Sequence, residues 1–464
     1  MSTQTVGGTS SRTPWSVVLA YGAPAVGMGY MSLLLSLYVM KFATDVLLIA
    51  PVVMGLIFSA SRIWDAVSDP LAGYLSDRTR SSLGRRRSWC LASAIPVGIT
   101  FIMVFSPPES LSGAALTAWM AVAIIGFYTA LTLFFVPHLS LGAELSSDYH
   151  ERTRLFGIRH SLYTVGSILA LVSMQFLIGA EASSEAEVRQ ISALQSWIAA
   201  VVMAALILYA VVKLRERTDF EHPNTSGPFQ AIKDVLANPH ARLLYTVWFI
   251  ENIGTSAIGA LTLYVTAYIV GASQWAPVII LCYMITSSLG VPVWLSLSRR
   301  WGKIHAWRIS MVGTGVSFGA MFGMLLFDSV EARLAWIMAF AFLAGFSAAG
   351  GGSTGPSVQS DVVDFDELKT GQRKEGSYYA AWNFVNKSAL GVILLLTGFV
   401  LEFSAFVPNQ VQTLEVKLAM LGLYGGAPLV FCTFGAWLFG RFQLDETAHL
   451  AIRAQIGGGR TSQA

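Results

Sequence analysis

Long apolar segments recur along this sequence from near its start to near its end, and short polar stretches separate them. About 20 apolar residues in an α-helix cross the roughly 30 Å of hydrocarbon in a bilayer. In hydrocarbon every backbone N–H and C=O needs an internal partner, so segments of this length form helices rather than loops. The pattern predicts twelve membrane spans, at about residues 15–40, 51–75, 88–106, 115–140, 157–178, 195–213, 241–270, 276–298, 305–327, 333–357, 377–401 and 416–441.

The amino-acid composition excludes an ordinary soluble protein. The 464 residues are 54% hydrophobic and 12% charged, whereas a soluble domain has about 25% charged residues. The cysteines Cys90, Cys282 and Cys432 lie in three different predicted spans, without the spacing of a disulfide framework or a metal site. We therefore expect an all-α membrane protein with no bound cofactor and no nucleic-acid partner.

Most of the 30 lysines and arginines lie at the termini and in alternate loops. Membrane proteins retain lysine and arginine on the cytoplasmic side of the bilayer. The bias predicts that both termini are cytoplasmic, which agrees with an even number of spans. We expect a multi-pass protein of a bacterial inner membrane.

One polar stretch, residues 214–240, divides the predicted spans into six and six. The segments LGRRRSW at 83–89 and WGKIHAW at 301–307 occupy the same place after the second span of each half. The sequence thus predicts a bundle at 1–213, a cytoplasmic linker with a short surface helix, a bundle at 241–442 and a tail at 443–464. Two pseudo-symmetric six-helix bundles, with the substrate between them near the bilayer midplane, are the plan of the major facilitator fold.

Three ionisable residues interrupt the second span: Arg62, Asp65 and Asp69. The two carboxylates are four residues apart and leave the same face of a helix. Each charged group costs roughly 2.5–3.5 kcal/mol in a span, so it needs a cavity, a partner or a bound ion. We interpret this face as a cation site. The alternative is a buried ion network with Arg62 or Lys387 that only ties helices together.

Lys387 lies in the middle of the eleventh predicted span and needs a counter-charge. Asp65 or Asp69 is the expected partner, and exchange of that partner when a cation enters could couple binding to helix movement. Near Lys387 on the same span lie Trp382, Asn383, Asn386 and, further out, Tyr378. These residues either line a substrate cavity or, for Tyr378, anchor the helix at the interface.

Three segments, RIWDAVSDPLAGYLSDRTRSSLGRRRSW, LGAELSSDYHERTRLFGIR and SDVVDFDELKTGQRKEG, resemble the glycoside–pentoside–hexuronide:cation symporters. The melibiose permeases are the best-known members. The resemblance implies that Asp65 and Asp69 bind the coupling cation, with Ser68 and Thr132 as further ligands. It also implies functional roles for Lys387 and Asn252.

The residues that hold the sugar in melibiose permeases differ here. A first-helix Lys-Asp pair corresponds to Met28 and Gly29, a fourth-helix aspartate to Phe135, and a nearby tryptophan to Leu139. The stretch FFVPH at 134–138 is similar to one in lysophospholipid transporters of the wider family. An amphipathic substrate therefore stays open beside a glycoside.

Other polar residues complete the candidate substrate and gate sets. The resemblance places a fifth-helix substrate arginine at Arg159 or His160. Glu251, inside the seventh span, is either a substrate or proton group or a hydrogen-bonded structural residue, and His138 is a gate or packing residue. The basic loop after the second span predicts a cytoplasmic gate of charge-assisted bonds. Its members, with those of two similar loops, are Asp77, Arg78, Arg85, Arg152, Asp364 and Arg373.

Gly351, Ser353 and Gly355 match the G-x-S-x-G pattern of hydrolases, but they lie in an apolar span rather than at a strand-to-helix turn. Their glycines predict helix bending or close helix packing instead. We expect no enzyme, and give a sensor or an intramembrane enzyme little weight.

The sequence therefore predicts a secondary active symporter, coupled to Na⁺ or H⁺, that takes up a glycoside or related small solute by alternating access. The alternative is a transporter of a lysolipid-like or steroid-like molecule. The expected partners are the substrate, a monovalent cation and the lipid bilayer, with the protein as a monomer.

Overall fold

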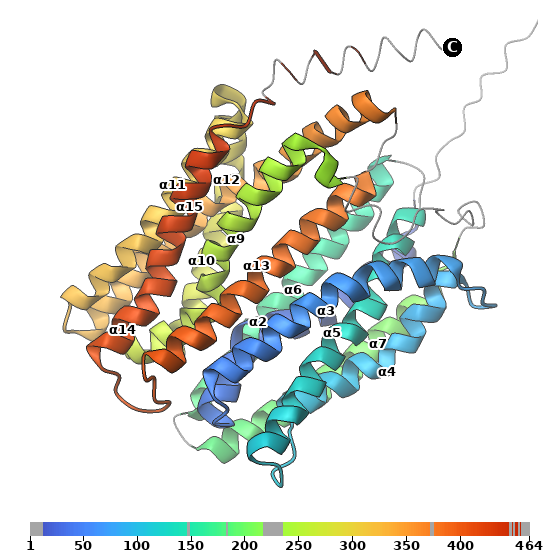
Figure 1. Ribbon diagram of the computed structural model, residues 1–464. Helices are drawn as coiled ribbons and strands as arrows, with labels where there is room; N and C mark the ends of the chain where they lie inside the picture. The colour runs from blue at the N-terminus through green and yellow to red at the C-terminus, as the bar shows by residue number, and fades with distance from the viewer. Residues whose placement is uncertain are drawn as a thin grey trace, which may run out of the picture. The chain divides into compact units, whose positions relative to one another are not determined.

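The computed structural model describes residues 13–145, 149–181, 184–216, 235–371 and 375–444, together with four positions in the tail. Helices account for nearly all of these residues (Figure 1). The predicted linker falls mostly outside the described residues, as does most of the predicted tail. The surface helix expected in the linker therefore stays a prediction.

The first six predicted spans are all helical. The first consists of two α-helices and a π-helical turn, and the others are single helices. Their bounds are α1 Trp15–Gly22, α2 Pro24–Lys41, η1 Phe42–Val46, α3 Pro51–Arg78, α4 Arg85–Phe105, α5 Gly113–Glu144, α6 Tyr149–Glu181 and α7 Glu185–Lys213.

The last six predicted spans are helical as well, and short π or 3₁₀ segments extend or interrupt three of them. Their bounds are α9 Pro239–Val265, η3 Thr266–Val270, η4 Ser273–Trp275, α10 Ala276–Trp301, α11 Lys303–Gly319, η5 Ala320–Leu326, α12 Val330–Thr370, α13 Glu375–Phe403, α14 Leu414–Leu421, η6 Gly422–Gly426 and α15 Ala427–Phe439.

Eleven of these segments are long and apolar enough to cross a membrane. The remaining one, α3, carries the charged residues of the second predicted span. Its 28 residues reach about 42 Å at 1.5 Å per residue, which is ample for a bilayer. The prediction of an all-α membrane protein with twelve spans is thus confirmed.

Two predicted cytoplasmic loops are partly helical. Residues 149–154 begin α6, and residues 364–370 end α12. Both stretches carry charged side chains, which led us to expect loops. A helix does not have to end where the bilayer ends, because its backbone groups stay paired in water as they do in hydrocarbon.

The repeated Gly-basic-Trp segment has the same backbone in both halves. Gly84 and Gly302 precede α4 and α11, with φ of 105° and 80° and ψ of 156° and 152°. A side chain is strained at such positive φ values, so glycine is required at both helix starts. This matched geometry supports the internal repeat read from the sequence.

The described chain divides into two compact units that cut across the predicted halves. Unit 1 comprises residues 1–35, 68–173 and 189–225, and unit 2 comprises 36–67, 174–188 and 226–464. Segments of the first half belong to unit 2 because they pack tightly on the second half. The start of α3 lies beside α13 (Figure 1), where a Cβ on Gly398 would lie 2.5 Å from the carbonyl oxygen of Pro51.

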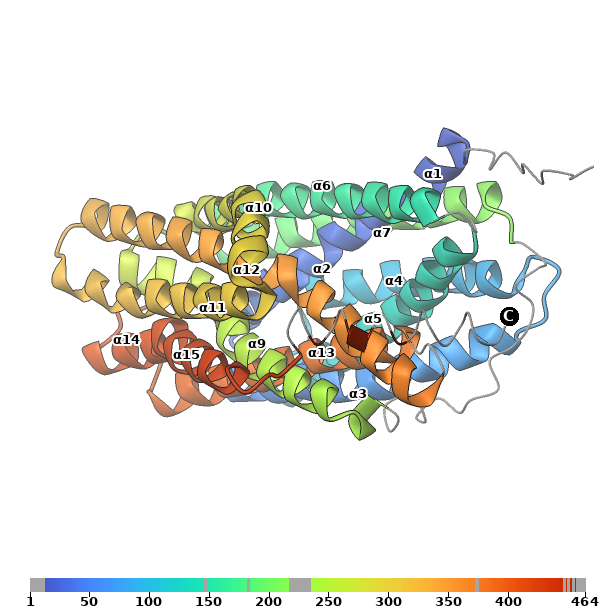
Figure 2. The same cartoon turned by 90° about the horizontal axis from the view of Figure 1, so that it is seen from above.

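Within unit 1, α2 and α6 meet backbone to backbone. A Cβ on Gly166 would lie 1.9 Å from the carbonyl oxygen of Val26, and one on Gly29 would lie 2.1 Å from that of Tyr163. Small residues allow such close helix contacts in membranes. Within unit 2, α12 packs against both α10 and α11 (Figure 2).

Candidate functional site

Asp69, Ser68 and Thr132 bring side-chain oxygens together within unit 1. The Thr132 hydroxyl of α5 donates a hydrogen bond to Asp69 Oδ1 of α3 over 2.7 Å. Thr132 and Ser68 are 4% and 8% exposed. The buried Ser68 hydroxyl has no hydrogen-bond partner among the described residues, which leaves its lone pairs available to an ion. A carboxylate with nearby hydroxyls is a donor set that suits a small hard cation.

Asp65 has a different environment, within unit 2. Its Oδ2 accepts a hydrogen bond from Arg62 Nη1 at 3.0 Å and lies 3.5 Å from Lys387 Nζ of α13. The Asp65 side chain is 1% exposed and that of Arg62 is 7% exposed. Close packing of α3 on α13 supports this group, since a Cβ on Gly391 would lie 2.8 Å from the Arg62 Cβ.

The expected counter-charge for Lys387 is therefore present, and it is Asp65. The structure also contains the ion network that was the alternative interpretation of the α3 face. Asp65 and Asp69 stand one turn apart on one helix, yet one is paired with two cationic side chains and the other with a hydroxyl. Cation binding at Asp69 stays a prediction, and so does coupling through Lys387.

A cluster of tryptophans lies in unit 2 between α9, α11 and α13. The rings of Trp248 and Trp382 are stacked, with centroids 4.1 Å apart and planes 23° apart. Trp307, fully buried, contacts both and donates its indole N–H to Glu251 Oε2 over 2.9 Å. The sequence analysis missed Trp248 and Trp307, although Trp248 stands one helical turn before Glu251.

The glycine-rich stretch of α12 packs on this cluster. A Cβ on Gly351 would lie 2.8 Å from Trp307 Nε1 and 3.0 Å from Glu251 Oε1, and one on Gly355 would lie 3.2 Å from Trp382. The glycines thus permit close packing, which was one of the two expected roles.

We expect G351A to lower the free energy of unfolding by about 1–3 kcal/mol, because an added methyl group overpacks a buried site. G352A is the matched control, since a Cβ on Gly352 would meet nothing within 4 Å. Thermal unfolding of the two purified variants measures the difference. Equal unfolding temperatures would show that the Trp307 and Glu251 side chains move aside freely.

The remaining substrate candidates fall into two groups. Asn383, Asn386 and His160 are exposed, and Arg159 is half-buried with its guanidinium carbon 5.4 Å from the centre of the Phe135 ring. These four side chains remain accessible to a solute.

The other candidates are held inside the protein. Asn252 donates a hydrogen bond to the carbonyl of Trp248 in its own helix. Tyr378 is fully buried and accepts a hydrogen bond from Asn238 over 2.8 Å. The expectation that Tyr378 lines a cavity is wrong for this structure, because its ring fills the core of unit 2. His138, between the Tyr21 and Phe134 rings, is a packing residue.

The substrate-binding positions of melibiose permeases are not only substituted but also closed here. Gly29 lies against the backbone of α6, so no larger side chain fits at that position. Met28 is 3% exposed, and Phe135 and Leu139 present apolar surface. This part of unit 1 therefore offers no carboxylate to a sugar hydroxyl at the four positions compared.

The predicted cytoplasmic gate contains an ion network within unit 1. Arg86 forms an ion pair with Asp77, and Arg85 Nη2 lies 2.7 Å from Glu144 Oε1 at the end of α5. Glu216 accepts the backbone N–H groups of Arg85, Arg86 and Arg87 over 2.7–3.0 Å. A carboxylate at a helix N-terminus satisfies unpaired N–H groups and the helix dipole.

Sequence reasoning missed Glu144 and Glu216, because neither stands in the basic loop itself. Arg78 is exposed and lies over the Tyr74 ring at 3.8 Å, and Asp364 is buried in α12. The Arg152 side chain and Arg373 lie outside the described residues. Whether these bonds break during a transport cycle stays a prediction.

Comparison with known proteins decides the family. The family described as MFS/sugar transport protein matches residues 20–446. The chain belongs to this family. It is therefore a multi-pass membrane transporter, and its charged and aromatic clusters are parts of a transport protein.

Individual relatives agree with the family. The isoprimeverose transporter of Lactiplantibacillus pentosus is 25% identical, over 90% of this chain and 87% of its own. Sodium-dependent lysophosphatidylcholine symporter 1 of Xenopus tropicalis is also 25% identical, over 89% of this chain and 84% of its own. A crystal structure of the nucleoside transporter NupG superposes with a TM-score of 0.67 and 15% identity, covering 91% of this chain and 99% of that one. At that identity the structural likeness shows the fold alone.

Proposed function

We propose that this transporter is a symporter in which a monovalent cation, Na⁺ or H⁺, binds at Asp69 and drives uptake of a small organic solute. The observation that carries the proposal is the Asp69–Thr132 hydrogen bond beside a buried serine hydroxyl with no partner among the described residues. A span retains such an arrangement at considerable cost unless an ion uses it. The names of the relatives, several of them symporters, support the same function.

Lys387 supplies the proposed coupling. The ammonium lies 3.5 Å from Asp65 and is the most exposed member of that group, at 27% against 7% for Arg62. A cation bound one helical turn away, at Asp69, repels the lysine and weakens its bond to Asp65. Lys387 then moves with α13, and this movement links ion occupancy to helix rearrangement.

A glycoside is the proposed substrate class. The stacked Trp248 and Trp382 rings offer a flat apolar surface to the C–H face of a sugar ring. Asn383 and Asn386 of the same helix as Trp382 are exposed and supply amide donors and acceptors for hydroxyl groups.

An amphipathic lysolipid is the second candidate. It is favoured by the apolar surface at Phe135 and Leu139, and by the closed position at Gly29, where melibiose permeases bind the sugar. The similarity to a lysophosphatidylcholine symporter supports the same alternative. We further propose a monomer in a bacterial inner membrane with both termini in the cytoplasm.

Counterflow into proteoliposomes tests these proposals. Vesicles are loaded with a methyl glycoside, a glucuronide or lysophosphatidylcholine, and entry of the labelled compound is followed with Na⁺, or with a proton gradient in its absence. We expect saturable exchange of a glycoside that one cation stimulates. Exchange of the lysolipid alone would establish the second candidate, and exchange that neither cation affects would refute the coupling.

A further inference from the structure

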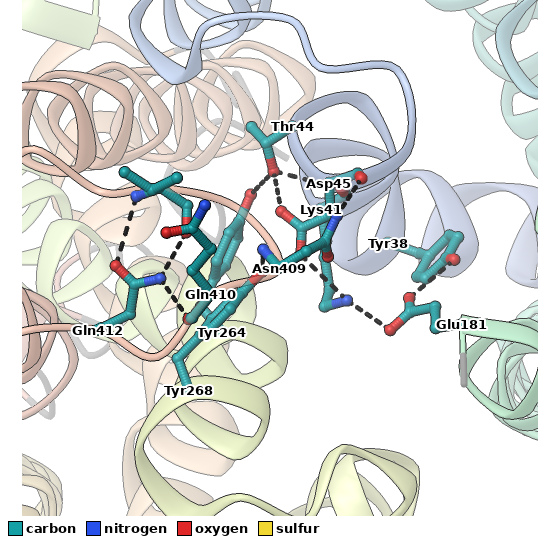
Figure 3. A network of polar contacts seen from close by, with 11 residues as sticks. Tyr38, Lys41, Thr44, Asp45, Glu181, Tyr264, Tyr268, Asn409, Gln410 and Gln412 are labelled. Carbon is teal, nitrogen blue, oxygen red and sulfur yellow. Dashed lines mark hydrogen bonds and ion pairs between the residues drawn. The ribbon is translucent and has the colours of Figure 1, made fainter. Parts of the chain in front are cut away.

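A buried polar network joins the ends of several helices in unit 2 (Figure 3). At its centre are Lys41, at the end of α2, and Asp45, in the π-helical turn η1. Their side chains are 5% and 3% exposed, and Lys41 Nζ lies 3.2 Å from Asp45 Oδ2. Neither residue belongs to the candidate cation site or to the predicted gate.

One part of the network lies wholly within the first half of the chain. Lys41 Nζ also lies 2.6 Å from Glu181 Oε2, at the end of α6. The Tyr38 hydroxyl donates to Glu181 Oε1 over 3.0 Å. Lys41 therefore neutralises Asp45 through residues that belong to the same half.

The other part joins the first half to the second. Tyr268, in the π-helical turn η3, donates its hydroxyl to Asp45 Oδ2 over 2.6 Å. The amide of Asn409 donates to the carbonyl oxygen of Asp45 over 2.9 Å. The hydroxyls of Thr44 and Tyr264 lie 2.7 Å apart. All three bonds reach the first half at two consecutive residues, Thr44 and Asp45 (Figure 3).

The network is a closed set of bonds rather than a ligand site. Both carboxylate oxygens of Asp45 accept hydrogen bonds, from Thr44 and Tyr268, and both of Glu181 do so, from Tyr38 and Lys41. No oxygen of the two carboxylates is left for an ion or a substrate. Two π-helical turns, η1 and η3, meet here in matching places of the two halves, and such turns are frequent at functional sites.

The position of the network decides which side of the membrane it serves. It lies at the end of α6 far from Tyr149 and at the end of α9 far from Pro239, where the predicted cytoplasmic loops begin. We propose that Thr44 and Asp45 form a latch that holds the outer side of the transporter closed. Like the transport cycle that it serves, this latch rests on the proposed function.

The arrangement makes the latch reversible. Opening breaks three hydrogen bonds to uncharged donors and acceptors of the second half, while Asp45 keeps its Lys41 partner. Removing the only partner of a buried charge costs several kcal/mol, and this division of the network avoids that cost. Asp45 is thus a positioning residue for the conformational change and has no contact with the transported molecules.

The test measures the outer opening directly, by distances between spin labels at L48C and V411C. Leu48 and Val411 are 64% and 95% exposed and follow closely after Asp45 and Asn409. The labels are placed in a protein whose three native cysteines are replaced. Reconstituted protein without added substrate is measured by pulsed electron paramagnetic resonance.

We expect Y268F to raise the ratio of long to short distances about tenfold, because it removes a charge-assisted hydrogen bond from the closed state only. Y38F is the matched control: it also removes a tyrosine hydroxyl from a carboxylate of the network, but within the first half, and should leave the ratio unchanged. An unchanged ratio in Y268F, or an equal rise in Y38F, would overturn the latch.

Y264F gives a second cross-half substitution if Y268F folds poorly, with the same expected direction. The distance readout needs no transported compound, so failure of the latch and failure of the proposed symport give different results. A protein that opens in Y268F but exchanges no solute keeps the latch and loses the proposed substrate. A protein that exchanges solute with unchanged distances in both cross-half variants keeps symport and loses the latch.

Discussion

Replacing Asp69 with asparagine is expected to abolish the stabilisation of the purified protein by its coupling cation. A cation at one hundred times its dissociation constant stabilises a folded protein by about 2.7 kcal/mol. Asparagine keeps the size of the side chain and its hydrogen bond to Thr132, but it removes the negative charge. Loss of a charged partner costs about 2–5 kcal/mol, so we expect cation affinity to fall by about 100-fold or more.

Thermal unfolding over a series of Na⁺ concentrations, and over a series of pH values without Na⁺, measures this effect. D328N is the control, because Asp328 is an exposed carboxylate in the loop before α12. T132V should weaken cation affinity in the same direction but less, since it removes a hydroxyl and leaves the charge. A D69N protein that the cation still stabilises as it does the wild type would rule out Asp69 as the binding carboxylate.

The second large effect is expected at Asp65, and it concerns stability. D65N leaves the Arg62 guanidinium, whose side chain is 7% exposed, and the Lys387 ammonium without their common carboxylate. Removing one partner of a buried ion network typically costs 3–5 kcal/mol. We therefore expect D65N to unfold at a markedly lower temperature than the wild type, even where no cation binds.

The double variant D65N/K387Q separates this cost from other effects of the substitution. Removing the lysine charge as well should restore part of the lost stability, because one uncompensated charge disappears. Uptake should not recover, since the proposed coupling pair is gone. If D65N were as stable as the wild type, or if the double variant were less stable than D65N, the Asp65–Lys387 interaction would not be the stabilising element described here.

Together these two experiments assign separate roles to two carboxylates that look equivalent in the sequence. Both stand on one face of α3, and the sequence analysis treated them as one cation site. The structure gives Asp65 two cationic partners and Asp69 a hydroxyl partner. A cation-dependent defect in D69N and a cation-independent one in D65N would establish that division.

Most of the fold was predictable from sequence, because hydrocarbon leaves a chain few choices. Apolar segments of span length must form helices, and all twelve predicted segments are helical. The repeat of Gly84 and Gly302 was visible because both positions need a positive φ. The helical continuations at 149–154 and 364–370 were missed because charge marks the edge of the bilayer but not the end of a helix.

The candidate site was only partly predictable. Arg62, Asp65, Asp69 and Lys387 stand out because a charge within an apolar span is costly. Trp248 and Trp307 gave no comparable signal, since aromatic residues are common in membrane helices. Tyr378 looked like a cavity residue from its place near Lys387, but the side of a helix that faces the core depends on its neighbours.

The distribution of apolar and charged residues thus specified the helices, their number and the residues that need partners, since these properties depend on local chain chemistry and the bilayer. Only the tertiary structure decided which partners meet: Lys387 with Asp65, Thr132 with Asp69, and Asp45 with Lys41, Tyr268 and Asn409. Each of these pairs joins residues far apart along the chain, and helix packing alone sets the distances between them. For the same reason the sequence did not reveal the network around Asp45, whose members come from four separate segments.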